Sequence, residues 1–359
     1  MLWRNIQPRL RHSIQIKYDK TPLMNRLSIT KIVFLVFLII GTIYILGKQK
    51  PYITNSGKIF GTYYNITYSS DTDLHNEIKS ILMQVDKSLS PFNKQSIITA
   101  INNNADATPD SMFVHVFTLA QEISAKTSGA FDITVAPLVN AWGFGFKKGI
   151  TPDSTTIDSL RQFIGYNTVS LTDGKVTKKH PQTMLDCSAI AKGYGCDAVA
   201  ATLEAHGVQN YMVEIGGEVV TKGNNNKGGL WTIGISKPTD NPTTSNNELQ
   251  EIIAISGKSM ATSGNYRNFR EVNGQKVAHT IDPRTGYPVQ HSLLSATVIA
   301  DDCATADAWA TSFMVMGLEK AMEICKSEES IEAYFIYSDG NGEFKTTETP
   351  GMKKYYLKK

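Results

Sequence analysis

The chain has 359 residues, of which 41% are hydrophobic, and a formal net charge of +3. Residues 1–31 contain seven Lys or Arg and one acid, so they carry +6 and leave −3 for the rest. This balance excludes a basic nucleic-acid-binding domain, and we expect no nucleic-acid partner. About 309 residues follow from Pro51 onwards, enough for one large domain or two small ones.

An apolar run extends from Ile32 to Leu46. It is short for a membrane span, which needs roughly 20 apolar residues, but Leu27, Ile29 and Thr30 extend it. The basic residues before it predict that the N-terminus stays inside. We expect a single-pass signal anchor in the cytoplasmic (inner) membrane, with the rest of the chain on the periplasmic or extracytoplasmic side. A cleaved signal is the alternative, and Met24 is a second candidate start.

The predicted organisation has four parts. Residues 1–31 form a basic cytoplasmic segment, 32–47 the transmembrane signal anchor, 48–57 a linker and 58–359 the folded domain. No zinc-like spacing occurs among the cysteines, whose redox state stays open; they are Cys187, Cys196, Cys303 and Cys325.

In chain order, β-branched and aromatic residues predict a strand over 58–69, and helical spacing of apolar residues predicts helices over 73–89 and 111–128. A hairpin over 169–184 follows, with Asp173-Gly174 as its turn, and then an Ala-rich helix over 189–205. Later strands are expected at 211–215, 231–235, 252–256, 277–281, 294–300 and 333–337, with polar loops at 224–229 and 240–247 and a helix at 304–316. Helices and hairpins intermix without strict βαβ alternation, which favours an α+β fold.

Two segments near the C-terminal end carry reactive groups. His279 to Gly286 places an imidazole, a carboxylate and a cation around a Pro and a Gly, which is typical of a rigid turn. Asp307 and Thr311 lie four residues apart, so both oxygens face one side of the predicted helix. A carboxylate with a hydroxyl is a hard-oxygen pair suited to magnesium.

Two segments upstream favour a ligand site. The start of the helix that follows Leu185 offers free backbone N–H groups to phosphate, Lys192 adds a charge, and Asp186 or Ser188 is expected to cap this helix. Glu214 to Glu218 ends a strand with two glycines, where a ligand or another backbone can approach closely.

With these segments in order, the chain resembles the ApbE family of FAD:protein FMN transferases. The resemblance extends from about Phe60 to Gly317. It rests on the segments at 60–63, 128–139, 142–145, 191–193, 214–217, 262–264, 279–286 and 306–311. It implies an α+β, T-fold-like catalytic domain that binds FAD as substrate together with Mg²⁺.

The resemblance also implies roles for particular residues. Asp307 and Thr311 would bind the metal by side chain, and Ala189 and Ala310 through their carbonyls; some family members have Asp at the latter position. The FAD contacts would be Phe60, Phe92, Ala130, Phe131, Asp132, Asp186, Lys192 and Ile281. Phe60 stands where many members have Met.

Transfer to a hydroxyl near neutral pH needs a base. His279 has the appropriate unperturbed pKa range, and Asp282 is the second candidate.

The resemblance implies transfer of FMN from FAD to a Thr or Ser hydroxyl, with release of AMP. The expected target is an exported protein or a membrane redox-pump subunit that presents an Asp-x-x-[Ser/Thr/Gly]-Ala-Thr-type acceptor. A magnesium-dependent FAD pyrophosphatase and a non-catalytic flavin-binding protein remain the alternatives. A redox flavoenzyme is disfavoured, because no G-x-G-x-x-G fingerprint follows a strand.

Overall fold

The computed structural model describes residues 21–46, 50–146, 152–238, 249–265, 269–272, 275–340 and 343–357. The chain divides into two compact units, Met1–Pro51 and Tyr52–Lys359. The second unit begins with a strand at Tyr52, inside the segment that we expected to be a linker. The polar loop predicted over 240–247 lies outside the described residues.

The first unit contains one described helix, α1 (Thr21–Leu46). None of the helices within the described ranges has the length and apolarity needed to cross a membrane. The anchor predicted over 32–47 is therefore not supported. The run of 15 residues from Ile32 to Leu46, which includes Gly41 and Thr42, is shorter than the roughly 20 that a span requires, and α1 reaches full length only by including Arg26 and Lys31.

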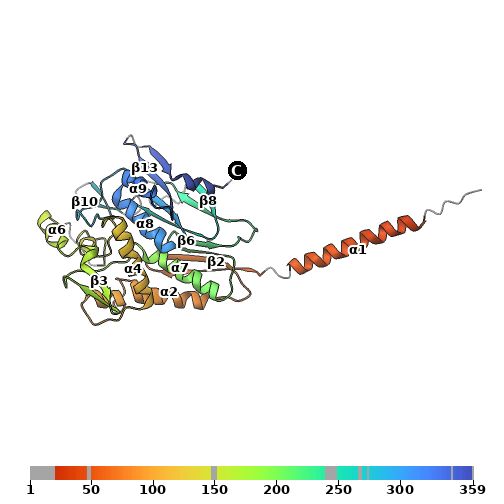
Figure 1. Ribbon diagram of the computed structural model, residues 1–359, viewed down its shortest axis with the longest axis horizontal. Coiled ribbons are helices and arrows are strands. Elements are labelled where there is room, and N and C mark those ends of the chain that lie inside the picture. The colour runs from red at the N-terminus through yellow and green to blue at the C-terminus, as the bar shows by residue number, and fades with distance from the viewer. Residues whose placement is uncertain are drawn as a thin grey trace, which may run out of the picture. The chain divides into compact units, whose positions relative to one another are not determined.

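The second unit is built on an eight-stranded sheet of order β1-β2-β5-β6-β9-β12-β13-β14 (Figure 1). All neighbouring strands in it are antiparallel. The strands are β1 (Tyr52–Ile59), β2 (Thr62–Ser69), β5 (Tyr211–Ile215), β6 (Glu218–Lys222), β9 (Lys258–Gly264), β12 (Leu293–Ala300), β13 (Glu332–Ser338) and β14 (Phe344–Glu348).

Three smaller antiparallel hairpins accompany this sheet. They are β3 (Val169–Thr172) with β4 (Lys175–Lys178), β7 (Trp231–Ser236) with β8 (Leu249–Ile255), and β10 (Phe269–Val272) with β11 (Gln275–Ala278). The predicted Asp173-Gly174 turn is confirmed. Both residues have positive φ, 51° and 72°, as a two-residue hairpin turn requires.

The strand predicted over 58–69 is instead a hairpin of β1 and β2. Phe60 and Gly61 have φ of 51° and 75°, and this left-handed pair reverses the chain. Continuous β-type composition on both sides concealed the turn, because Phe60 is an unusual residue for positive φ. The turn matters for function because it places Phe60 beside the helices described next.

The described helices of the second unit are α2 (His75–Leu89), α3 (Ile97–Asn102), α4 (Ser111–Lys126), α5 (Ala136–Ala141), α6 (Ser154–Arg161), α7 (Ala191–Ala205), α8 (Cys303–Met316) and α9 (Leu318–Cys325), with short 3₁₀ turns at Tyr166–Thr168 and Pro350–Tyr355. Of these, α7, α8 and α9 pack directly against strands of the sheet. α8 packs against β9, β12, α4 and α7, and α7 packs against β5 and β6. The mixed α/β fold predicted from the sequence is confirmed.

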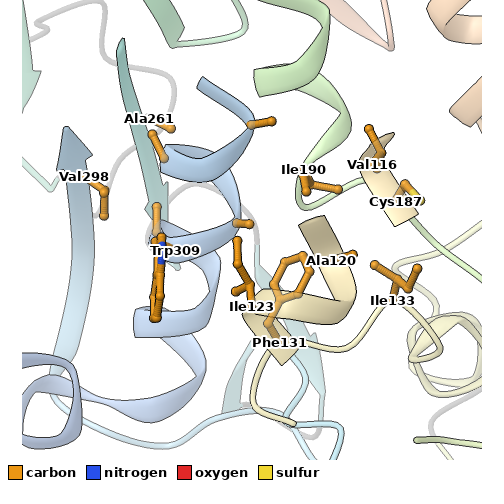
Figure 2. Close-up of a cluster of buried hydrophobic side chains, with 14 of the residues drawn as sticks. Val116, Ala120, Ile123, Phe131, Ile133, Cys187, Ile190, Ala261, Val298 and Trp309 are labelled. Carbon is orange, nitrogen blue, oxygen red and sulfur yellow. The ribbon is translucent and has the colours of Figure 1, made fainter. Parts of the chain in front are cut away.

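The core follows the two-residue alternation of the strands. Ala261 and Val298 face the helices, whereas their neighbours Met260 and Ile299 face a second cluster that β7, β8 and Met352 cover. Figure 2 shows Trp309 of α8 beside Ala261 and Val298, with Phe131 on the other side of the helix. Both faces of the central strands are thus buried. The face that carries Ala261 and Val298 packs against α8 and holds this helix in place on the sheet.

Candidate functional site

The close contact between α7 and α8 is the centre of the candidate site. Gly193 lies in the first turn of α7, where a Cβ atom would be 2.3 Å from the carbonyl oxygen of Cys303 and 2.9 Å from Cα of Ala304. Real Cβ atoms never approach backbone so closely. Only glycine therefore allows the start of α7 to meet α8 at this distance.

Asp307 of α8 takes part in this contact through its buried carboxylate. Its Oδ2 accepts a hydrogen bond from the backbone N–H of Gly193 at 3.0 Å. The N-cap of α7 is Ile190, which makes no side-chain capping bond, and Asp186 accepts from Ser188 N–H instead. The predicted cap by Asp186 or Ser188 is therefore wrong: a carboxylate of another helix satisfies this first-turn amide.

Lys192 joins two buried carboxylates. Its Nζ lies 2.7 Å from Oε1 of Glu218 and 3.5 Å from Oδ1 of Asp307. Burial would lower the pKa of Lys192, but the attraction of Asp307 and Glu218 outweighs it, so its pKa is raised and the ammonium stays charged. Burial raises the pKa of Glu218 against the opposing effect of Lys192.

The other residues predicted to bind metal lie around this group. Thr311, one turn after Asp307, has its Oγ1 3.0 Å from Oγ of Ser263 in β9. Ala310 is fully buried with its methyl group in the core, and Ala189 packs against the same core just before α7. Within the described ranges no group of three or more His, Cys, Asp or Glu residues is arranged to hold a metal.

The turn at 279–286 is held by its own side chains. Asp282 Oδ1 accepts from the backbone N–H and from Nε of Arg284, both at 2.9 Å, and Oδ2 accepts from Arg284 Nη2 at 2.8 Å. Trp142 Nε1 donates to the carbonyl of Gly286 at 2.9 Å. Asp282 is thus engaged in shaping the turn, which favours His279 over Asp282 as a base.

His279 lies half-buried at the start of that turn, with its ring 6.4 Å from the ring of Phe144. The next residue, Thr280, donates from Oγ1 to Oδ1 of Asn265 at 2.6 Å. Asn265 directly follows β9, two residues after Ser263. A short hydrogen-bonded path therefore connects the His279 turn to the strand that contacts Thr311.

The predicted FAD contacts fall into two groups. Phe60 lies against α7, where a Cβ atom at Gly195 would be 2.8 Å from its ring, and Lys192 lies in the same helix. Phe92 is 62% exposed, and its ring stands edge-on to that of Phe146 at 6.1 Å. The ring of Phe92 is accessible to a ligand, and the ring of Phe60 lies against the helix that carries Lys192.

The second group is more strongly engaged in the fold. Ala130 and Phe131 are buried, Phe131 in the core, and Ile281 packs against Leu138 and Ile157. Their side chains serve packing, so a contact with FAD would come from their backbone.

The two carboxylates among the predicted FAD contacts are also buried. Asp132 accepts from the N–H and hydroxyl of Thr134 and from Tyr166 N–H, at 2.6 to 2.8 Å. Burial raises the pKa values of both Asp132 and Asp186. The Asp186 backbone N–H donates to the Ile133 carbonyl at 2.7 Å, which links the two predicted segments.

Two clefts accompany these segments. One, of about 220 Å³, lies between the Asp132 region and the Arg284 turn; Gly129, Asp132, Arg161, Ile164, Gly165, Tyr166, Asn167, Pro283 and Arg284 line it. The other, of about 550 Å³, lies over α4, α7 and the start of α8. The first therefore borders two predicted FAD segments, whereas none of the predicted site residues lines the second.

Glu218 and Ser263 were not assigned roles from the sequence. Glu218 stood at the Gly-Gly strand end, and Ser263 in the segment 262–264 that contributes to the family resemblance. A glutamate directly after two glycines at the end of a strand was the available signal. Its pairing with Lys192 joins residues 26 positions apart and becomes visible only in the fold.

Asp197 of α7 binds the start of α8, and its raised pKa leads us to expect a pH effect on the stability of the fold. Its carboxylate accepts from Cys303 N–H and Ala304 N–H, each at 2.8 Å, and burial raises its pKa to about 7. An unfolded Asp titrates near pH 4, so between about pH 4 and 7 the folded state holds the extra proton and stability falls as pH rises.

Asp197→Asn should remove that slope. Urea unfolding at pH 5 and pH 8 should show the unmodified protein losing on the order of 2–3 kcal/mol more than the variant over this interval. Equal losses in both proteins would show that Asp197 titrates normally. Asp301→Asn, which changes an exposed acid near the same helix, is the matched control.

The cluster gathers carboxylate, ammonium and hydroxyl groups at the contact between α7 and α8. The model of the ApbE family matches residues 60–335, and the chain belongs to that family.

Relatives and solved structures agree with this assignment. An FAD:protein FMN transferase of Haemophilus influenzae is 38% identical over 324 residues, covering 86% of this chain and 92% of the relative. One from Escherichia coli K12 is 34% identical over 84% of this chain and 88% of its own length. The flavin transferase ApbE from Vibrio cholerae superposes with a TM-score of 0.77 at 34% identity, over 85% of this chain and 99% of that one. The apo flavinyl transferase ApbE of Pseudomonas stutzeri gives 0.76 at 32%, over 86% and 98%.

Proposed function

We propose that this protein transfers FMN from FAD to a Thr or Ser hydroxyl of a target protein, with Mg²⁺, and releases AMP. The observation that supports this proposal most strongly is the Lys192–Asp307 ion pair at the α7–α8 contact, in a chain whose relatives are FAD:protein FMN transferases. The activity belongs to the unit that begins at Tyr52. We propose an exported protein or membrane redox-pump subunit with an Asp-x-x-[Ser/Thr/Gly]-Ala-Thr-type acceptor as the target.

The residues present fit magnesium. Asp307, Thr311 and the carbonyls of Ala189 and Ala310 offer only oxygen donors, with a single carboxylate among them. Mg²⁺ prefers such hard ligands, uses one or two carboxylates and fills its remaining positions with water and substrate phosphate. When bound, it would neutralise charge on the pyrophosphate.

The protein groups around the pyrophosphate have separate tasks. Lys192 places a permanent positive charge near the departing AMP phosphate, which stabilises the charge that develops there. His279 takes the proton of the acceptor hydroxyl. The hydroxyl oxygen then bonds to the phosphorus of the FMN group, and the P–O bond to AMP breaks. Phe60 and Phe92 supply aromatic faces for the flavin or adenine, and Ala130, Phe131, Asp132, Asp186 and Ile281 complete the FAD contacts.

His279→Asn should separate binding from chemistry. Asparagine cannot accept the proton, so we expect FMN transfer to fall by about 10²–10⁴-fold while FAD affinity changes little. Transfer rates and quenching of flavin fluorescence measure the two quantities. Near-normal transfer by the variant would discard His279 as the base. Asp282→Asn is the variant whose transfer rate is compared with that of His279→Asn. Asp282 is the second candidate base, and its carboxylate already accepts a hydrogen bond from Arg284.

AMP release distinguishes transfer from hydrolysis. With FAD and Mg²⁺, a transferase should release AMP in proportion to added acceptor protein and little without it. AMP and free FMN at the same rate without acceptor would support a pyrophosphatase, in which water replaces the hydroxyl. FAD bound with no AMP under either condition would favour a flavin-binding protein.

A further inference from the structure

Glu218 is a buried acid that has no role in the function proposed above. It is the first residue of β6 and directly follows Gly216 and Gly217. These glycines have φ values of 65° and 106° and form the turn between β5 and β6, the two strands against which α7 packs. Its neighbour Val219 faces the second core cluster, so Glu218 faces the helices. Its side chain is only 3% exposed, and Oε1 accepts the hydrogen bond from Lys192 at 2.7 Å.

The fold alone does not account for this residue. Its second oxygen, Oε2, is buried and has no hydrogen-bond partner among the described residues. A buried carboxylate oxygen without a partner costs stability, and an apolar residue would avoid that cost. Such a residue is expected where function, rather than packing, determines the side chain.

The distances show which acid holds the ammonium. At 2.7 Å the Lys192–Glu218 contact is a charge-assisted hydrogen bond, whereas the 3.5 Å to Asp307 is too long for one. Without a charge at position 218, the nearest carboxylate to Lys192 is that of Asp307. The existing Lys192–Asp307 ion pair of 3.5 Å would then tighten to a direct hydrogen bond, which would have to break before a cation could bind Asp307.

We infer that Glu218 is a positioning residue: it holds Lys192 away from Asp307 and so keeps Oδ1 of Asp307 available to a divalent cation. The inference rests on the proposed function, since it requires that Asp307 bind Mg²⁺. It adds a residue that acts through Lys192 and touches neither metal nor substrate.

The test measures Mg²⁺ binding to the full chain without FAD, by isothermal titration calorimetry. Glu218→Gln keeps the size of the side chain and removes its charge. We expect its Kd for Mg²⁺ to rise about tenfold, because the Lys192–Asp307 ion pair becomes tighter and must break before the cation binds. Adding Lys192→Met removes the competing ammonium and should restore the Kd to within about threefold of the unmodified protein.

Each other outcome is decisive. An unchanged Kd for Glu218→Gln would overturn the inference, and so would a double variant that binds as weakly as Glu218→Gln alone, which would make Glu218 a direct ligand. Loss of folding or a large fall in melting temperature in Glu218→Gln would show a structural role and also overturn it. If Asp307→Asn leaves Mg²⁺ affinity unchanged, the metal site itself fails, and with it the metal-dependent function.

Discussion

Replacing Asp307 by asparagine should reduce FMN transfer by about a thousandfold or more. The variant keeps an oxygen that accepts from Gly193 N–H, so the α7–α8 contact survives. It loses the only carboxylate among the predicted metal ligands, and a neutral amide binds Mg²⁺ poorly. Charge stabilisation at the transferred phosphate is the main task of such a site, so its loss affects the rate directly.

The measurement is the initial rate of FMN transfer across a Mg²⁺ titration, with circular dichroism to confirm folding. Asp301→Asn is the matched control, since that acid precedes the same helix but is 77% exposed. It should transfer FMN at the unmodified rate. An Asp307→Asn variant that keeps more than about a tenth of normal activity at the Mg²⁺ concentration that half-saturates the unmodified protein would contradict the assignment.

Gly193→Ala should damage both stability and activity. The new Cβ would lie 2.3 Å from the Cys303 carbonyl oxygen, and both contacting groups are backbone, so α7 and α8 must separate. We expect a loss of about 3 kcal/mol in the free energy of unfolding, at the upper end of overpacking effects. The separation also displaces the N–H that Asp307 binds, so transfer should fall in the protein that remains folded.

Gly195→Ala, two residues along the same helix, is the control. Its Cβ would meet the side chain of Phe60 at 2.8 Å, and a ring at a hairpin turn can move where helix backbone cannot. Urea unfolding should therefore place Gly195→Ala between Gly193→Ala and the unmodified protein. Equal stability of all three proteins would show that the α7–α8 contact is looser than described.

Sequence patterns predicted the elements that are long, periodic or bounded by clear turn residues. The helices at 111–128 and 304–316 correspond to α4 and α8, because apolar spacing and the N-cap residues Asp110 and Asp302 act locally. The turn at Phe60 was missed, because only tertiary packing against Gly195 explains an aromatic residue at positive φ. Short helices such as α3 and α9 were missed because few residues define their period.

Individual residues of the candidate site could be predicted from the sequence, but the contacts between them could not. Asp307, Thr311 and Lys192 were named from spacing and resemblance, and the structure brings Lys192 and Asp307 together. Their partners Glu218 and Ser263 come from strands β6 and β9, and no local pattern specifies contacts across such sequence distances. The expected cap of α7 failed for the same reason, because its acceptor lies more than a hundred residues away.

The measurement that tests the function most directly is the intact mass of an acceptor protein. The full chain would be incubated with FAD, Mg²⁺ and a protein that carries an Asp-x-x-Ser-Ala-Thr-type segment. We expect the acceptor to gain the mass of one FMN unit, with an equal amount of AMP. The gain should disappear with EDTA, with Asp307→Asn, and with alanine at the acceptor Thr. An acceptor of unchanged mass while AMP accumulates would contradict the transferase and favour hydrolysis of FAD.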